Sequence, residues 1–132
     1  MVCSYPRSRG SVWFERLYQQ NAIELELVPQ GTLAERMRAA GAGLGGFFTP
    51  TGYGTALADG KETRMIDGRG HVLEAPLAAD YALLSAYKAD PWGNLVYNTA
   101  ARNFNPVMAT AANRAVVEVG ERVALGELNP EA

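Results

Sequence analysis

The residue type most concentrated at one place in this chain is glycine, which forms the phosphate-binding loops of many nucleotide sites. Six glycines fall within the fourteen residues from Gly41 to Gly54, too many for an ordinary linker. A dinucleotide fingerprint must follow a strand and open a helix, whereas this segment follows a predicted helix. A P-loop is absent as well, because Gly60-Lys61 continues into Glu62 rather than serine or threonine. The glycines therefore give no support for ATP or dinucleotide chemistry.

The other reactive side chains lack the neighbours that catalysis would need. His71 opens an apolar run with no Cys, His or Asp at ligand spacing, so we interpret it as structural or on the surface and expect no metal site. Cys3 is the single cysteine, cannot form an internal disulfide, and is expected to be a small buried apolar residue. No serine lies in a nucleophile-elbow motif, and no glutamate has the glycine-flanked setting of an exposed nucleophile. The chain is therefore expected to lack its own nucleophile.

Composition places the chain among small globular domains and excludes several classes of partner. With 132 residues, 48% apolar and 20% charged, it has the size and apolar content of one domain, residues 1–132. Its 12 basic and 14 acidic side chains give no broad positive field, so no nucleic-acid partner is expected. Its apolar runs are shorter than the roughly 20 residues of a membrane helix, and no signal region opens the chain. We expect a cytoplasmic protein without a membrane partner.

The elements that must position any site begin with a short strand and loop over residues 1–10. Helical spacing of apolar residues predicts a helix over 12–20 with one face packed on a sheet, and alternation predicts a strand over 23–28. Thr32 and Glu35 form a capping-box pattern, so a helix is expected over 33–40 that stops at Gly41. The first element is a strand with no helix before it, so the domain is expected to be cut at its start.

Alternating short strands and helices continue after the glycines. We expect a polar hairpin over 59–67, strands over 71–74 and 81–87, and a type I turn from Asp90 to Gly93 that leads into a strand over 95–97. Asn105 and Pro106 resemble an N-cap and first helical residue for a helix over 107–113, before a buried strand over 116–119. The pattern predicts an α/β fold.

Several segments, in order and spacing, closely resemble the A (alpha) chain of family I CoA-transferases. The central ones are residues 26–36 (ELVPQGTLAER), 41–43 (GAG) and 48–55 (FTPTGYGT). Further matches are 60–62 (GKE), 72–74 (VLE), 79–83 (ADYAL), 88–90 (KAD), 92–95 (WGNL), 101–105 (ARNFN) and 117–119 (VEV). The resemblance covers nearly the whole chain. The opening Cys3-Ser4-Tyr5-Pro6-Arg7 resembles the 3-oxoadipate branch rather than the acetoacetate branch.

The resemblance implies an open, mostly parallel sheet with flanking helices, of the CoA-transferase or NagB-RpiA-like type. It also implies that this chain is the C-terminal two-thirds of that domain, N-terminally truncated, without the family's Gly-Gly-Phe-Gly-type loop. Members move CoA between carboxylic acids through a glutamyl-CoA thioester on a B subunit. Gln30 is then expected at the active site, where its amide would donate to the oxyanion. The alternative is that Gln30 only helps to cap the helix.

The same resemblance gives the glycine-rich segment a purpose, since bare backbone lets a thioester and its pantetheine arm come close. The expected substrate and CoA contacts are Gly41, Gly43, Gly45, Gly46, Thr49, Gly52, Tyr53 and Gly54. Tight packing of strands and turns is the alternative explanation for these glycines. Arg7 or Arg9 is expected to bind the distal carboxylate of a dicarboxylate, because a guanidinium grips a carboxylate bidentately, although a solvated loop is an alternative.

The prediction is thus the alpha chain of a CoA-transferase that moves CoA from succinyl-CoA to a 3-oxo acid, most simply 3-oxoadipate, and needs a B subunit. CoA thioesters are substrates, and no tightly bound cofactor is expected. One departure is Asn98, where the family usually has a basic residue. The alternatives are an inactive, truncated interaction module and the corresponding chain of a succinyl-CoA:acetoacetate CoA-transferase.

Overall fold

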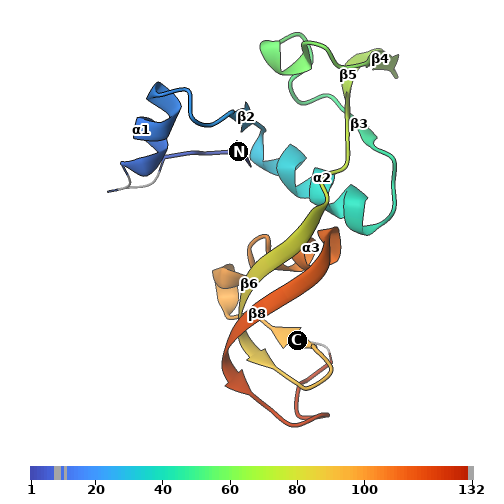
Figure 1. The fold of residues 1–132 in the computed structure, drawn as a ribbon. Helices are drawn as coiled ribbons and strands as arrows, with labels where there is room; N and C mark the ends of the chain where they lie inside the picture. Colours follow the sequence, from blue (N-terminus) through green and yellow to red (C-terminus); the bar gives the residue numbers. More distant parts are fainter. Residues whose placement is uncertain (8–9, 11, 131–132) are drawn as a thin grey trace. The chain divides into compact units, whose positions relative to one another are not determined.

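A computed structural model describes residues 1–132 except 8, 9, 11, 131 and 132. The chain divides into two compact units. The first unit comprises Met1–Arg36 and Gly45–Ala75, and the second comprises Met37–Leu44 and Pro76–Ala132. The division falls inside helix α2, Gln30–Gly41 (Figure 1). No helix among the described residues is long and apolar enough to cross a bilayer.

The first unit opens with a two-stranded parallel sheet. Strand β1, Val2–Cys3, pairs with β2, Glu26–Leu27, and helix α1, Trp13–Gln19, lies between them in the chain. The strand predicted over 23–28 is observed only over Glu26–Leu27, because its partner β1 provides only two residues for pairing. The prediction that α1 packs an apolar face on a sheet is wrong, because α1 has no buried residue and Trp13 is 66% exposed.

Helix α2 starts earlier than the capping-box pattern predicted. The Pro29 carbonyl accepts the first bond, from the Leu33 amide at 2.9 Å, so Thr32 lies inside the first turn rather than at the N-cap. The end of the helix at Gly41 is confirmed. Just beyond it, Gly43 has φ +69°, and the amide of Leu44 donates to the Ala39 carbonyl. This is a Schellman motif, which needs a left-handed residue at that place.

A three-stranded antiparallel sheet completes the first unit, in the order β3-β5-β4. Its strands are β3, Phe47–Thr49, β4, Thr63–Ile66, and β5, Arg69–Glu74, with a 3₁₀ turn η1 at Ala56–Ala58. The hairpin predicted over 59–67 lies further along the chain, between β4 and β5, and its two turn residues Asp67 and Gly68 have φ +48° and +72°, as a type I′ turn requires. Val72 of β5 is 1% exposed and lies at the centre of this unit's core.

The second unit is built on two long parallel strands, β6, Ala79–Ala89, and β8, Ala112–Arg122. Between them in the chain lie β7, Leu95–Val96, which pairs antiparallel with β6, the 3₁₀ helix η2, Thr99–Arg102, and helix α3, Asn105–Ala111 (Figure 1). Alternate residues of β6, namely Ala82, Leu84 and Ala86, are buried, while Leu83 between them is 75% exposed. The α/β fold class predicted from the sequence is confirmed, with both parallel and antiparallel ladders.

Two local predictions in this unit are corrected. Asn105 is not an N-cap: Phe104 holds that place, while the Asn105 Oδ1 accepts from the Ser85 amide at 3.2 Å and its Nδ2 donates to the Ala101 carbonyl at 2.9 Å. The strand predicted as buried over 116–119 is part of β8, but it is largely exposed, and Val116 is 55% exposed. The turn from Asp90 is confirmed by the Gly93 amide donating to the Asp90 carbonyl at 3.1 Å.

Candidate active site at the start of helix α2

Gln30 is the first residue of α2, and its side chain is exposed. The opening amides of an α-helix have no partner within the helix, and the aligned peptide dipoles place partial positive charge there. The first turn of α2 contains no acidic residue that would offset this charge. A carboxamide in this position can donate a hydrogen bond outward, next to a backbone region that favours negative charge.

A hollow of about 270 Å³ lies beside Gln30 within the first unit. It is lined by residues from the start of α2 and from the end of β3: Pro29, Gly31, Thr32, Ala34, Glu35, Phe47, Thr49 and Thr51. The Thr49 hydroxyl accepts from the Thr51 amide at 3.2 Å, which fixes the turn after β3. Thr49, one of the predicted substrate contacts, thus lines the same hollow as the chain neighbours of Gln30, and its contact with a substrate stays a prediction. This arrangement suits a small group that carries a developing negative charge.

Arg36, one turn and a half after Gln30, holds α2 in the first unit. Its side chain is only 10% exposed. The Nη1 atom donates to Oε1 of Glu26 on β2, and Nε donates to the Ala75 carbonyl at 2.9 Å. One guanidinium therefore connects α2 to β2 and to the residue after β5.

Glu74 brings a second cation to the same cluster. Its side chain is 5% exposed, with Oε2 at 4.0 Å from Arg36 Nε and Oε1 accepting from Lys61 Nζ at 2.7 Å. We call Glu26, Arg36, Lys61 and Glu74 the buried ion cluster. Sequence reasoning missed it. One signal was available, since Arg36 lies four residues after Thr32 and three before Ala39, and hence on the helix face that proves to be buried.

The predicted glycine contacts are divided between the two units. Gly45 and Gly46 belong to the first unit, whereas Gly41 and Gly43 belong to the second. A Cβ on Gly41 would lie 2.5 Å from the Thr110 Oγ1 atom, so this glycine permits close packing of α2 on α3. Gly46 has φ +142°, and a Cβ there would lie 2.8 Å from the Glu74 carbonyl oxygen. For these positions the structure supports the packing explanation, and a contact with CoA stays a prediction.

Residues 52–54 form the turn between β3 and η1. Gly52 and Gly54 have φ +86° and +74°, and the Gly52 carbonyl accepts from Thr55 Oγ1 at 2.7 Å. The Tyr53 ring lies against Gly70 of β5, where a Cβ would be 2.1 Å from the ring. Tyr53 therefore packs on the β4–β5 hairpin while 45% of it remains exposed.

Of the two predicted specificity arginines, one is described. Arg7 Nε lies 3.0 Å from Glu15 Oε1 of α1, and the two side chains are 70% and 46% exposed. Such an exposed pair contributes little stability, and a contact of Arg7 with a substrate carboxylate stays a prediction. Arg9 lies outside the described residues.

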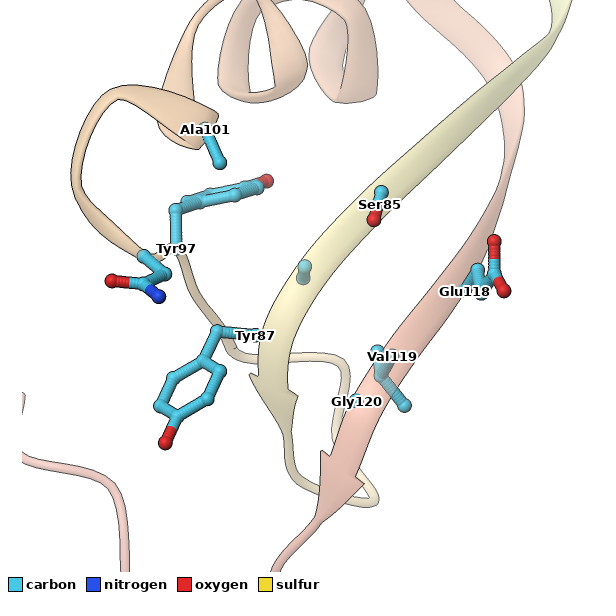
Figure 2. Close-up of a pocket in the computed structure, with 9 residues that line it drawn as sticks. Ser85, Tyr87, Tyr97, Ala101, Glu118, Val119 and Gly120 are labelled. Atoms are coloured by element: carbon cyan, nitrogen blue, oxygen red, sulfur yellow. The ribbon is translucent and has the colours of Figure 1, made fainter.

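The second unit has a separate hollow of about 360 Å³ that sequence reasoning did not anticipate. Figure 2 shows Ser85 on β6, Glu118 on β8, and the Tyr97 ring extending from the segment before η2. Burial raises the pKa of Tyr97, and the nearby Arg102 guanidinium partly opposes that rise. Asn98, which was noted above as a departure from the family pattern, also lines this hollow. Among the described residues, no three His, Cys, Asp or Glu side chains gather as metal ligands would.

Comparison with known proteins gives a consistent result. The family described as coenzyme A transferase matches residues 1–132. The chain is 62% identical to the A subunit of a 3-oxoadipate CoA-transferase from Pseudomonas putida, over 99% of this chain and 57% of the relative. It is 56% identical to the A subunit of a succinyl-CoA:3-ketoacid coenzyme A transferase from Xanthomonas campestris, over 99% of this chain and 53% of the relative. The chain thus spans about half the length of the curated relatives that it matches.

Solved structures agree on the fold. An acyl-CoA transferase from Escherichia coli O157:H7 superposes with a TM-score of 0.77 at 22% identity, covering 88% of this chain and 26% of that one. The glutaconate coenzyme A-transferase from Acidaminococcus fermentans superposes with a TM-score of 0.74 at 18% identity, covering 86% of this chain and 42% of that one.

Proposed function

Because the chain belongs to the coenzyme A transferase family, we propose that it supplies the oxyanion-binding side of a transferase that moves CoA from succinyl-CoA to 3-oxoadipate. The nucleophilic glutamate would come from a B subunit. The observation that carries the proposal is the exposed Gln30 at the start of α2, beside a hollow of about 270 Å³. The relatives named as A subunits of 3-oxoadipate CoA-transferases support the substrate. Cytoplasmic location is part of the same proposal, since CoA thioesters are its substrates.

The proposed chemistry explains why a neutral donor is useful. The partner's glutamate carboxylate attacks the thioester carbonyl, CoA thiolate leaves, and a mixed anhydride forms. The thiolate then attacks the glutamyl carbonyl of that anhydride, which releases succinate and leaves glutamyl-CoA. The 3-oxoadipate carboxylate accepts CoA by the reverse sequence. Each addition places negative charge on a carbonyl oxygen, and the Gln30 amide donates to it without any proton transfer.

The buried ion cluster has a supporting role in this proposal. A donor contributes to catalysis only if it is held where the oxyanion forms, to within a fraction of an ångström. Arg36 links α2 to β2 and to Ala75, and Glu74 is held in turn by Lys61. These contacts fix the start of α2 relative to β3 and the rest of the first unit.

The test is Gln30→Ala in the complete heteromeric enzyme. Loss of one well-placed oxyanion donor is expected to lower kcat by about 10²- to 10³-fold, with glutamyl-CoA formation slowed when it is followed by mass spectrometry of the B subunit. Gln20→Ala, an exposed glutamine just after α1, is the matched control and should leave kcat unchanged. Unchanged turnover in Gln30→Ala would remove the proposed role.

A second candidate is the succinyl-CoA:acetoacetate reaction, favoured by the 56% identity to the Xanthomonas campestris protein. Comparing kcat/KM for 3-oxoadipate and acetoacetate in the same heteromer separates the two. An inactive interaction module would give stable binding to the B subunit without turnover of either acid.

A further inference from the structure

The hollow beside Gln30 is rich in hydroxyl groups. Three of its eight lining residues are threonines, Thr32, Thr49 and Thr51. Thr32 is only 5% exposed, whereas Thr49 is half-buried and Thr51 is exposed. A ligand in the hollow can therefore reach the hydroxyls of the two threonines at the end of β3 and in the turn that follows it.

The charge of the hollow restricts the chemical group that it can hold. Among the described residues that line it, Glu35 is the only ionisable one, and no lysine, arginine or histidine is present. A full substrate carboxylate would be unfavourable in this space, because a charge that leaves water needs a paired cation. Hydroxyl donors without a cation suit a neutral acceptor instead, such as a carbonyl oxygen.

Thr49 is the better fixed of the two accessible hydroxyls. Its Oγ1 accepts from the Thr51 amide at 3.2 Å. A threonine hydroxyl has two lone pairs and one proton, so Thr49 can accept this bond and still donate its proton. In the sheet, Thr49 lies directly opposite Val72, which is 1% exposed. Thr49 is thus a hydroxyl donor that is held by both the turn and the core of the first unit.

We propose that the Thr49 hydroxyl donates to the C3 carbonyl oxygen of a 3-oxo acid and so determines which acids accept CoA. This inference rests on the proposed function, in which Gln30 binds the oxyanion that forms at C1. C3 is two bonds from C1, and the hollow is lined by Pro29 and Gly31, on either side of Gln30 in the chain. An acid with C1 at Gln30 therefore brings its C3 oxygen to this hollow.

The chemistry of the substrates makes this contact selective. The two candidate acceptors, 3-oxoadipate and acetoacetate, both have a carbonyl at C3 and differ only beyond it. Succinate, the acid released from the donor, has a methylene group at C3 and offers Thr49 no acceptor there. The Thr49 hydroxyl should therefore contribute to the half-reaction of a 3-oxo acid and not to that of succinate.

The test compares the two half-reactions of Thr49→Val in the complete heteromeric enzyme. Valine keeps the shape of the side chain and removes the hydroxyl. Loss of one neutral hydrogen bond should lower kcat/KM roughly 5- to 10-fold, by the same factor for 3-oxoadipate and acetoacetate. Exchange of labelled succinate into succinyl-CoA should stay close to that of the parent. Thr49→Ser, which keeps the hydroxyl, should recover most of the lost activity.

Thr63→Val is the matched control. Thr63 of β4 also lies opposite Val72, on the other side of β5 from Thr49. It is exposed and is not among the residues that line the hollow. The control should change neither half-reaction. Both rates are measured on one preparation of each variant, so a misfolded fraction cancels from their ratio.

The outcomes separate this inference from the transferase proposal. Equal losses in the two half-reactions of Thr49→Val would mean that the hydroxyl only holds the turn or binds the CoA arm, which both reactions share, and would refute the inference. Unchanged kcat/KM for both 3-oxo acids would refute it as well. In either case, succinate exchange by the parent enzyme leaves the transferase proposal standing. If the parent heteromer shows no exchange, the transferase proposal fails and this inference fails with it.

Discussion

Replacing Arg36 by methionine should destabilise the first unit far more than an ordinary arginine substitution. Arg36 donates to the Ala75 carbonyl and to Glu26, and it is one of two cations near the Glu74 carboxylate. Methionine fills similar volume but leaves the Ala75 carbonyl without this donor and Glu74, 5% exposed, with Lys61 alone. Removing one partner of a buried ion pair typically costs about 3 to 5 kcal/mol. Because Lys61 stays and Glu26 is half exposed, we expect about 3 kcal/mol, the lower end of that range.

Urea unfolding and thermal melting measure the effect. A loss of about 3 kcal/mol corresponds to a fall in Tm of roughly 10 °C for a chain of this size. Arg64→Met is the matched control, because Arg64 pairs with Glu62 at the surface, with side chains 60% and 50% exposed, and should cost about 1 kcal/mol or less. If both variants unfold at the same urea concentration, the buried ion cluster does not stabilise the unit and our account of α2 is wrong.

Three further changes have defined outcomes. Hydrogen bonds from Asn94 hold the pKa of Asp90 below its usual 3.8. The stability that Asp90 contributes is therefore complete above that pH and is lost as the pH falls through the lowered pKa. We expect the Tm of Asp90→Ala to fall less steeply than that of the parent between about pH 5 and pH 2. Gly70→Ala would place a methyl group 2.1 Å from the Tyr53 ring and should cost about 1 to 3 kcal/mol, a cost that a Tyr53→Ala background should largely remove in a double-mutant cycle. Arg7→Ala should lower kcat/KM for 3-oxoadipate roughly tenfold more than for acetoacetate, and equal losses for both acids would refute a role in specificity.

Features that depend on adjacent residues were predicted well from the sequence. The turn from Asp90 to Gly93 forms because Asp, Pro and Gly favour the required backbone angles. The hairpin expected over 59–67 is displaced to β4 and β5, where Asp67 and Gly68 make the turn. The end of α2 at Gly41 was also correct. Family membership, inferred from motifs over nearly the whole chain, is confirmed by the match over residues 1–132.

Features set by distant residues were predicted poorly. Thr32 and Glu35 have the spacing of a capping box, but the Pro29 carbonyl provides an earlier first acceptor, so the helix starts at Gln30. Asn105 is a residue type that is common at N-caps, but its side-chain oxygen accepts a hydrogen bond from the Ser85 amide of β6, twenty residues earlier. A local pattern cannot show which of two competing hydrogen bonds the tertiary structure will favour.

The candidate site combines residues named from the sequence with contacts that only the structure shows. Thr49 lines a hollow that the chain neighbours of Gln30 also line, and the predicted roles of both residues stay predictions. The buried ion cluster was not predicted, because Arg36 and Glu74 are far apart in the chain and each has ordinary neighbours. The roles of the glycines also required the structure, since only a neighbouring atom such as Thr110 Oγ1 distinguishes a packing glycine from one that leaves space for a ligand.

The parallel ladder of β6 and β8 has a consequence for the order in which the chain folds. Its paired residues are 33 positions apart, from Ala79 with Ala112 to Ala89 with Arg122, whereas β4 and β5 are joined by a two-residue turn. Closing a long loop costs entropy before any ladder contact forms, and short hairpins form within microseconds. We expect pulse-labelled hydrogen exchange to protect the amides of β5 before those of β8. During synthesis, β6 would therefore be present before its pairing partner β8, and we expect chaperones to bind mainly to β6.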